Sequence, residues 1–118
     1  KQVESRQQEV SVLSRNLKLL AKDLDVPVIA VAQLNRGPEA RTDKKPMMSD
    51  LRESGSLEQD ADIIILLHRP EYYNPEDRPG EADIILAKHR NGETGTIRVL
   101  FQGHMARFAN FTSREEPA

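Results

Sequence analysis

The sequence predicts an α/β fold with parallel core strands followed by an antiparallel hairpin. Three observations lead to this prediction. The first 24 residues carry an apolar stripe with helical spacing, residues 28–32 and 63–67 are uninterrupted apolar runs, and an Asn91-Gly92 pair separates two later apolar segments. Strands buried on both faces of a parallel sheet have such continuous runs. A helix followed at once by a buried strand is the second half of a right-handed βαβ unit.

Composition limits the class of protein. The 118 residues fit one domain or part of a larger one, and 37% hydrophobic with 4% aromatic residues predicts a lean core. With 17 Lys and Arg against 19 Asp and Glu, the net charge of −2 gives no global signature of nucleic-acid or membrane binding. No apolar run is long enough for a membrane span, and no signal peptide is recognised. The lack of cysteine excludes disulfides and agrees with a cytoplasmic location.

The first predicted element is a helix over about residues 4–24. Its apolar residues recur at intervals of three and four, as expected for one face of a helix: Val10, Leu13, Leu17, Leu20 and Leu24. Asp25 and Pro27 are expected to end it. Because the chain opens on Lys1 without a methionine and enters this helix directly, we expect it to be a piece of a longer protein.

The predicted strand 28–32 is followed at once by polar residues, among them Gln33 and Arg36. Ligands of open parallel sheets bind beyond the carboxyl ends of the strands, so an amide and a guanidinium here are candidate site residues. The same residues also fit an ordinary strand end that faces water.

A polar loop is predicted after this strand. Residues 36–45 contain four cations and two anions, a local surplus of two positive charges, together with Gly37 and Pro38. This composition argues against a packed element. A solvated loop fits it, but loops of this length inside a compact domain are more often functional.

Residues 49–62 combine a short helical turn, which Ser49 is suited to cap, with a glycine-containing loop. Arg52 and the Gly55 N–H both fit contact with a phosphate backbone. A simple helix–turn–strand connector fits the spacing equally well. The carboxylates of Glu58, Asp60 and Asp62 are interpreted as helix-end and turn residues, and no metal is assigned to them.

The remaining chain is expected to complete the sheet. Residues 63–67 form a central strand, 82–87 a third strand, 96–102 its antiparallel return across Asn91-Gly92, and 106–111 a last short strand before a disordered tail at 112–118. The irregular stretch 68–80 holds Tyr72 and Tyr73, which fit stacking on a base or, more simply, anchoring of the loop.

Other kinds of site find no support in the sequence. The three histidines lie far apart, and no nucleophile elbow and no glycine-rich phosphate loop is present.

Five blocks, in this order along the chain, resemble the replicative DNA helicases of the DnaB family: Ser5–Val10, Gln33–Arg36, Asp50–Gly55, Glu58–Asp62 and Lys88–Gly92. The resemblance runs from about residue 5 to residue 111. It implies a RecA-like P-loop NTPase fold, of which residues 1–111 are the C-terminal part that follows the Walker B strand.

The resemblance also implies function. DnaB-type proteins are rings of six motor domains that hydrolyse ATP with Mg²⁺ at subunit interfaces, translocate on single-stranded DNA and unwind the duplex during DNA replication. The implied partners are single-stranded DNA, five further copies of the chain, primase and a helicase loader, with no membrane. Gln33 is expected to sense the γ-phosphate and attacking water, and Lys88 and Arg90 to reach the neighbouring subunit's ATP, with Arg90 as the finger.

The same resemblance implies that Arg52, Glu53 and Gly55 belong to a pore loop that grips the DNA backbone. Because a carboxylate repels phosphate, Glu53 is expected to orient Arg52 or to contact a neighbouring loop.

The sequence departs from the family pattern at His89, where glutamine is usual, and at Glu93-Thr94. It also contains neither Walker motif, so the main residues for ATP and Mg²⁺ are expected outside it, and the piece alone is expected to be inactive. Two alternatives stay open: a single-stranded-DNA-binding module without ATP turnover, and another RecA-like ring ATPase.

Overall fold

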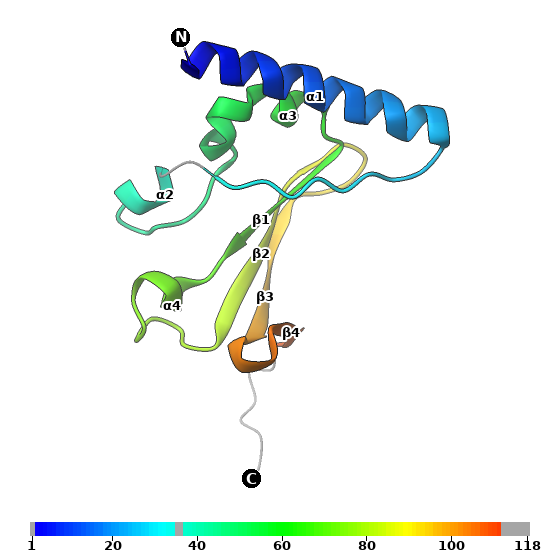
Figure 1. Cartoon of the computed structure of the whole chain (residues 1–118). Coiled ribbons are helices and arrows are strands. Elements are labelled where there is room, and N and C mark those ends of the chain that lie inside the picture. Colours follow the sequence, from blue (N-terminus) through cyan, green and yellow to red (C-terminus); the bar gives the residue numbers. More distant parts are fainter. Residues whose placement is uncertain (1, 35–36, 112–118) are drawn as a thin grey trace.

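The computed structural model describes residues 2–34 and 37–111. The helices within residues 2–24 and 48–60 lie at one end of a long antiparallel sheet, and the short helix at residues 70–73 lies at the other end (Figure 1). Within the described residues, no helix combines the length and apolarity needed to cross a membrane. The elements are α1 (Gln2–Leu24), α2 (Gly37–Ala40), η1 (Met48–Ser54), α3 (Gly55–Asp60), β1 (Ile63–His68), α4 (Pro70–Tyr73), β2 (Glu81–His89), β3 (Gly95–Gln102), η2 (Gly103–Met105) and β4 (Arg107–Asn110).

The predicted N-terminal helix is confirmed as α1. It ends where Asp25 takes a left-handed backbone with φ of 55°, and the N–H of Val26 donates to the carbonyl of Ala21 at 3.1 Å. Such a left-handed residue is a common way to satisfy the last helical carbonyls. Much of the apolar stripe, including Leu13, stays exposed.

The prediction of a buried strand at 28–32 is wrong for this structure. Residues 26–34 are extended but not paired, and Ile29 and Val31 are 88% and 96% exposed. Residues 28–32 have the amino-acid composition of a central strand. A strand also needs a neighbour to supply ladder hydrogen bonds, and no strand within residues 2–34 and 37–111 does so.

The expectation of parallel strands is wrong for the sheet that the structure describes. Its four strands have the order β1-β2-β3-β4, and each neighbouring pair is antiparallel. β1 pairs with β2 from Ile63 opposite His89 to His68 opposite Asp83, because the stretch 69–80 reverses the chain direction. As the edge strand, β1 alternates exposed and buried residues and is not buried on both faces.

The predicted antiparallel hairpin is confirmed. β2 and β3 pair from Glu81 opposite Leu100 to Leu86 opposite Gly95, with Asn91-Gly92 in the connection. The last predicted strand is present as β4, which pairs with the end of β3. The Asn91-Gly92 turn signal was sufficient to predict this hairpin, because the two strands of a hairpin are neighbours in the sequence.

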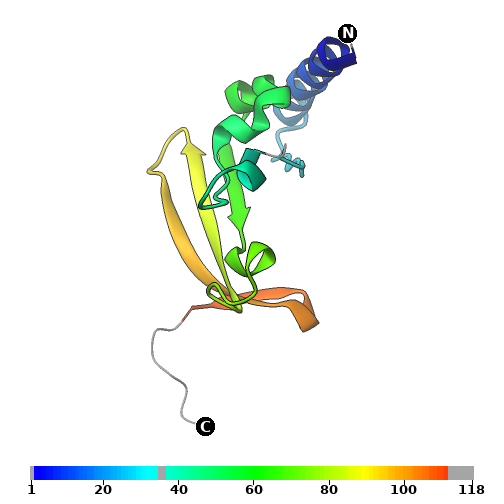
Figure 2. The same cartoon turned by 90° about the vertical axis from the view of Figure 1, so that its left-hand side faces the viewer.

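The apolar core is small, as the composition predicts. Leu51, Ile64 and Leu66 form its buried cluster, and Leu34 and Met48 are among the partly buried residues packed against it. The cluster therefore joins η1 to one face of β1 and places α3 and α1 at the upper end of the sheet, as the two views agree (Figure 2).

Residues 37–45 of the predicted loop, the part that the structure describes, are more ordered than expected, since they contain the short helix α2 with buried Pro38. Arg36 of this loop lies outside the described residues. Arg41 donates two hydrogen bonds to the buried carboxylate of Asp50, at 3.1 and 2.5 Å, and also binds the carbonyl of Lys45. Asp50 further accepts the Met47 N–H at 2.7 Å. By accepting this hydrogen bond, Asp50 binds the backbone just before the first residue of η1. Ser49, which the sequence predicts as the cap, lies inside η1 instead.

Burial of His68 leads to a pH prediction. His68 ends β1 opposite Asp83 and is 6% exposed. Burial lowers its pKa below 6.5, and the charges of Arg78 and Lys45 act in the same direction against that of Asp83. As pH falls below 6.5, the unfolded chain therefore binds a proton that the folded chain does not. We expect stability to fall by at most about 1.4 kcal/mol per pH unit from this group.

Urea unfolding of a complete protein containing this sequence, at a series of pH values from about 7.5 downward, measures this slope. His68→Gln should flatten it, and the exposed His104→Gln should not. An unchanged slope in His68→Gln would contradict the assignment.

Candidate functional site

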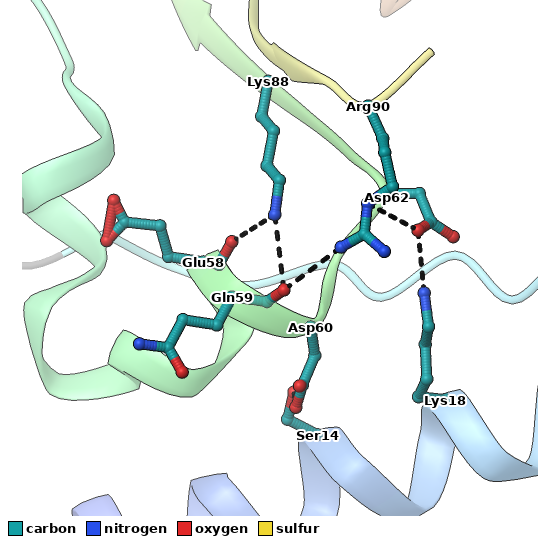
Figure 3. A network of polar contacts seen from close by, with 8 residues as sticks. All are labelled: Ser14, Lys18, Glu58, Gln59, Asp60, Asp62, Lys88 and Arg90. Carbon is teal, nitrogen blue, oxygen red and sulfur yellow. Dashed lines mark hydrogen bonds and ion pairs between the residues drawn. The ribbon is translucent and has the colours of Figure 1, made fainter.

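Lys88 and Arg90 lie side by side at the hairpin end of β2, and both reach the last turn of α3 (Figure 3). Lys88 Nζ donates to the carbonyl oxygens of Glu58 at 2.8 Å and Gln59 at 3.3 Å. Arg90 Nη2 donates to the Gln59 carbonyl at 3.4 Å. The two cations that the sequence singles out are therefore brought together by the fold.

The last turn of α3 explains why cations gather there. The final carbonyls of a helix have no partner inside the helix and are commonly bound by Lys or Arg side chains. The Leu57 carbonyl accepts the Ala61 N–H at 3.0 Å, while those of Glu58 and Gln59 accept Lys88 and Arg90. Lys88 and Arg90 thus cap the C-terminal end of α3.

Asp62 adds a carboxylate to the same cluster. Its Oδ1 lies 2.8 Å from Lys18 Nζ of α1 and 3.4 Å from Arg90 Nε. The hydrogen bond from Lys18 lowers the pKa of Asp62, and the charges of Arg90 and Lys88 lower it further. The backbone adds a fixed point, since the Arg90 N–H donates to the Asp62 carbonyl at 2.9 Å.

The neighbouring carboxylate, Asp60, connects α3 to α1 by a partly buried hydrogen bond. Ser14 Oγ donates to Asp60 Oδ2 at 2.7 Å, and Ser14 is almost fully buried (Figure 3). Asp60 and Asp62 therefore both connect the end of α3 to α1. The polar cluster of Ser14, Lys18, Asp60, Asp62, Lys88 and Arg90 is called the α3 junction below.

The predicted DNA-contacting block lies at the other end of the same helix. Arg52 and Glu53 belong to η1, and Gly55 is the first residue of α3. Their backbone is described, but the side chains of Arg52 and Glu53 lie outside the described residues. The six-residue helix α3 thus separates the predicted DNA block from the carbonyls that hold Lys88 and Arg90.

Gln33 lies in the extended segment that follows α1, with its side chain exposed. The next residue, Leu34, packs against the core cluster that includes Ile64, the β-partner of Lys88. This places the Gln33 segment at the upper end of the sheet. Within the described residues, no hydrogen bond joins Gln33 to Lys88 or Arg90, so the three predicted catalytic side chains are not assembled here.

Tyr72 and Tyr73 lie apart from the α3 junction. They belong to α4, at the opposite end of the sheet, where their rings meet edge to face at 5.2 Å between centroids (Figure 1). They therefore do not contribute to the site around Lys88 and Arg90.

Lys18, Asp60 and Asp62 were not predicted as site residues. The sequence block Glu58–Asp62 is a signal, but the sequence alone assigns its carboxylates only to a helix end and a turn. The missing information is tertiary, since Lys18 is 44 residues from Asp62 in the chain.

Comparison with known proteins identifies the family of the chain. The sequence model of the family described as "DnaB-like helicase C terminal domain" matches residues 1–110. Replicative DNA helicase DnaB of Mycobacterium intracellulare is 70% identical over 111 residues, which cover 93% of this chain and 19% of that protein. The Geobacillus stearothermophilus protein of the same name is 53% identical over 116 residues, covering 98% and 26%.

Solved structures confirm the fold. A DnaB-like replicative helicase, described together with its interactions with primase, superposes with a TM-score of 0.85 at 48% identity, covering 90% of this chain and 26% of that one. A solved ATPase domain gives a TM-score of 0.86, also at 48% identity, with 90% and 38% covered. These similarities confirm the α/β, RecA-like fold class, and the chain spans about a fifth to a quarter of the curated relatives quoted above. The chain belongs to the DnaB-like helicase C-terminal domain family.

Proposed function

We propose that this chain is the C-terminal part of the motor domain of a replicative DNA helicase. The complete protein, a ring of six subunits, would couple ATP hydrolysis to movement along single-stranded DNA and to duplex unwinding. The observation that carries the proposal is the pairing of Lys88 and Arg90 at one end of α3 with the predicted DNA block at its other end, in a chain that matches the helicase family over residues 1–110.

On the ATP side, the chain supplies hydrogen-bond donors. Lys88 and Arg90 are suited to bind phosphate oxygens of the neighbouring subunit's ATP, with the Arg90 guanidinium neutralising charge that develops in the transition state. Arg90 is 48% exposed, which leaves it accessible to a neighbouring subunit. The Gln33 amide is assigned the sensing of the γ-phosphate and attacking water. We assign no ligand for Mg²⁺ from this sequence.

On the DNA side, Arg52 and the Gly55 N–H are assigned to the phosphate backbone of single-stranded DNA, with Glu53 supporting Arg52. Contact with phosphate alone carries no base information, so binding is independent of sequence and weakens with salt. Because one similar solved structure is described together with its interactions with primase, we also assign primase as a partner of the complete protein. From the family resemblance we further assign a helicase loader as a partner and the cytoplasm as the location.

The alternatives are less well supported. A DNA-binding module without turnover is disfavoured because the chain matches the helicase family over residues 1–110. Another RecA-like ring ATPase is disfavoured because the relatives quoted, at 70% and 53% identity, both carry the name of the replicative helicase.

The proposal is tested by ATP hydrolysis and forked-duplex unwinding by the complete protein, with Arg52→Ala as the diagnostic variant. Each phosphate contact to a single strand contributes about 0.7 to the slope of log affinity against log salt. We therefore expect Arg52→Ala to weaken single-stranded DNA binding for all sequences alike and to reduce that slope. The matched control, Arg15→Ala, removes an exposed cation of α1. An unchanged affinity and slope in Arg52→Ala would remove the DNA assignment.

A further inference from the structure

The α3 junction connects two sites that the proposed function treats separately. α3 has six residues, so the predicted DNA block at Gly55 and the capped carbonyl of Gln59 belong to one rigid piece of backbone. The helix is continuous from Gly55 to Asp60, so a displacement of α3 as a unit would also displace the carbonyls that hold Lys88 and Arg90.

We infer that Asp62 and the end of α3 position Lys88 and Arg90, so that DNA contact at the start of α3 is transmitted to the cation pair. This inference rests on the proposed function. Asp62 is a positioning residue, since its own contacts are with Lys18 and Arg90 and with the Arg90 backbone.

Among the residues of the α3 junction, Asp62 is the most useful one to substitute in a test, because its side chain contacts both Lys18 and Arg90. Lys18 Nζ and Arg90 Nε both approach its Oδ1, at 2.8 and 3.4 Å. The carboxylate therefore fixes the guanidinium relative to α1, while Gln59 fixes its other nitrogen relative to α3. With an Asp62 side chain that is 58% exposed, each ion pair alone stabilises little. The Asp62 carboxylate therefore acts mainly on the orientation of the Arg90 guanidinium.

The experiment measures ATP hydrolysis by the complete protein, with and without single-stranded DNA, for Asp62→Asn. This change keeps the side-chain size and removes the charge. Because small misplacements of a catalytic group are costly, we expect the DNA-stimulated kcat to fall about tenfold. The basal rate should fall less than the DNA-stimulated rate, because the DNA contact is what the end of α3 transmits. The KM for ATP and the DNA affinity should each change less than about twofold. Asp62→Glu, which keeps the charge, should recover part of the stimulation.

Lys18→Gln provides a second variant, because it breaks the same bridge from α1. The expected loss of DNA stimulation is in the same direction and smaller, since the contact of Asp62 with Arg90 remains. Asp23→Asn, an exposed carboxylate on the same helix, is the matched control and should leave the stimulation unchanged.

A double-mutant cycle identifies the residue through which Asp62 acts. In an Arg90→Ala background, Asp62→Asn should have almost no further effect. If both changes multiply, the positioning role of Asp62 is overturned. If Asp62→Asn lowers basal and DNA-stimulated rates equally, the transmission of DNA contact to the cation pair is overturned. If Arg90→Ala itself retains the full DNA-stimulated rate, it is the proposed function of Arg90 that fails, and the two failures are thereby distinguished.

Discussion

Arg90→Ala is expected to reduce ATP hydrolysis by the complete protein by about 10³-fold or more. A guanidinium that neutralises developing charge on a transferred phosphoryl group contributes about 10³–10⁵ in rate. Arg90 lies at the end of β2, beside the exposed hairpin, and its guanidinium is held by the Gln59 carbonyl and the Asp62 carboxylate. Both partners are acceptors, so a phosphate oxygen can replace them. The steady-state rate with saturating single-stranded DNA is the measurement.

Mixed rings test whether Arg90 acts on a neighbour. We would combine Arg90→Ala subunits with subunits whose own ATP site is disabled by loss of the phosphate-loop lysine. Each variant alone should be inactive, and the mixture should recover activity, since the second subunit still offers Arg90 to the first. Arg98→Ala, an exposed cation on β3, is the control and should stay within about twofold of wild type. A normal rate in Arg90→Ala would reduce Arg90 to a surface cation.

Arg78→Asn is expected to destabilise the fold by about 3 kcal/mol. Arg78 holds Asp83 by two hydrogen bonds, at 3.0 and 2.7 Å, and donates a third to Glu81 at 2.9 Å. The Asp83 side chain is 7% exposed, so loss of Arg78 leaves a buried carboxylate without its cation. Asparagine is chosen because Arg78 has a left-handed φ of 46°, which asparagine tolerates better than alanine.

The burial of the Arg78–Asp83 ion pair also predicts that loss of Arg78 and loss of Asp83 destabilise the fold to different extents. The Arg78 side chain is 30% exposed and can be hydrated when Asp83 is lost, whereas Asp83 cannot be when Arg78 is lost. Asp83→Asn should therefore cost less than Arg78→Asn in urea unfolding of the complete protein. Arg98→Gln, whose ion pair with Glu81 is longer at 3.8 Å and more exposed, should change stability by less than about 0.5 kcal/mol. Equal losses for Arg78→Asn and Arg98→Gln would refute the assignment.

The stability that the Arg78–Asp83 ion pair contributes is expected to decrease at low pH. The hydrogen bonds from Arg78 lower the pKa of Asp83 below 3.8, against the effect of burial. The stabilisation is therefore complete above that pH and is lost as the pH falls from 3.8 through the lowered value. The difference between wild type and Arg78→Asn should shrink over the same range.

Local sequence signals determined the elements whose partners lie nearby in the chain. The three- and four-residue spacing of leucines determined α1, and Asn91-Gly92 determined the β2–β3 hairpin. The ordered blocks also determined the helicase family, because each block keeps its residue types and order independently of how the chain packs. Lys88 and Arg90 were singled out in this way.

Tertiary structure alone decided what depends on distant partners. The run 28–32 has the composition of a buried strand but remains unpaired and exposed, since pairing requires a neighbouring strand that the run itself cannot specify. The direction of β1 against β2 depends on how residues 69–80 turn back. Likewise, the contact of Lys18 with Asp62, and of Lys88 with the Glu58 carbonyl, joins residues 44 and 30 positions apart. A helix carbonyl carries no signal in the sequence that says which side chain will bind it. The contacts of the cation pair were therefore decided only by the tertiary structure, which brings the end of α3 within reach of Lys88 and Arg90.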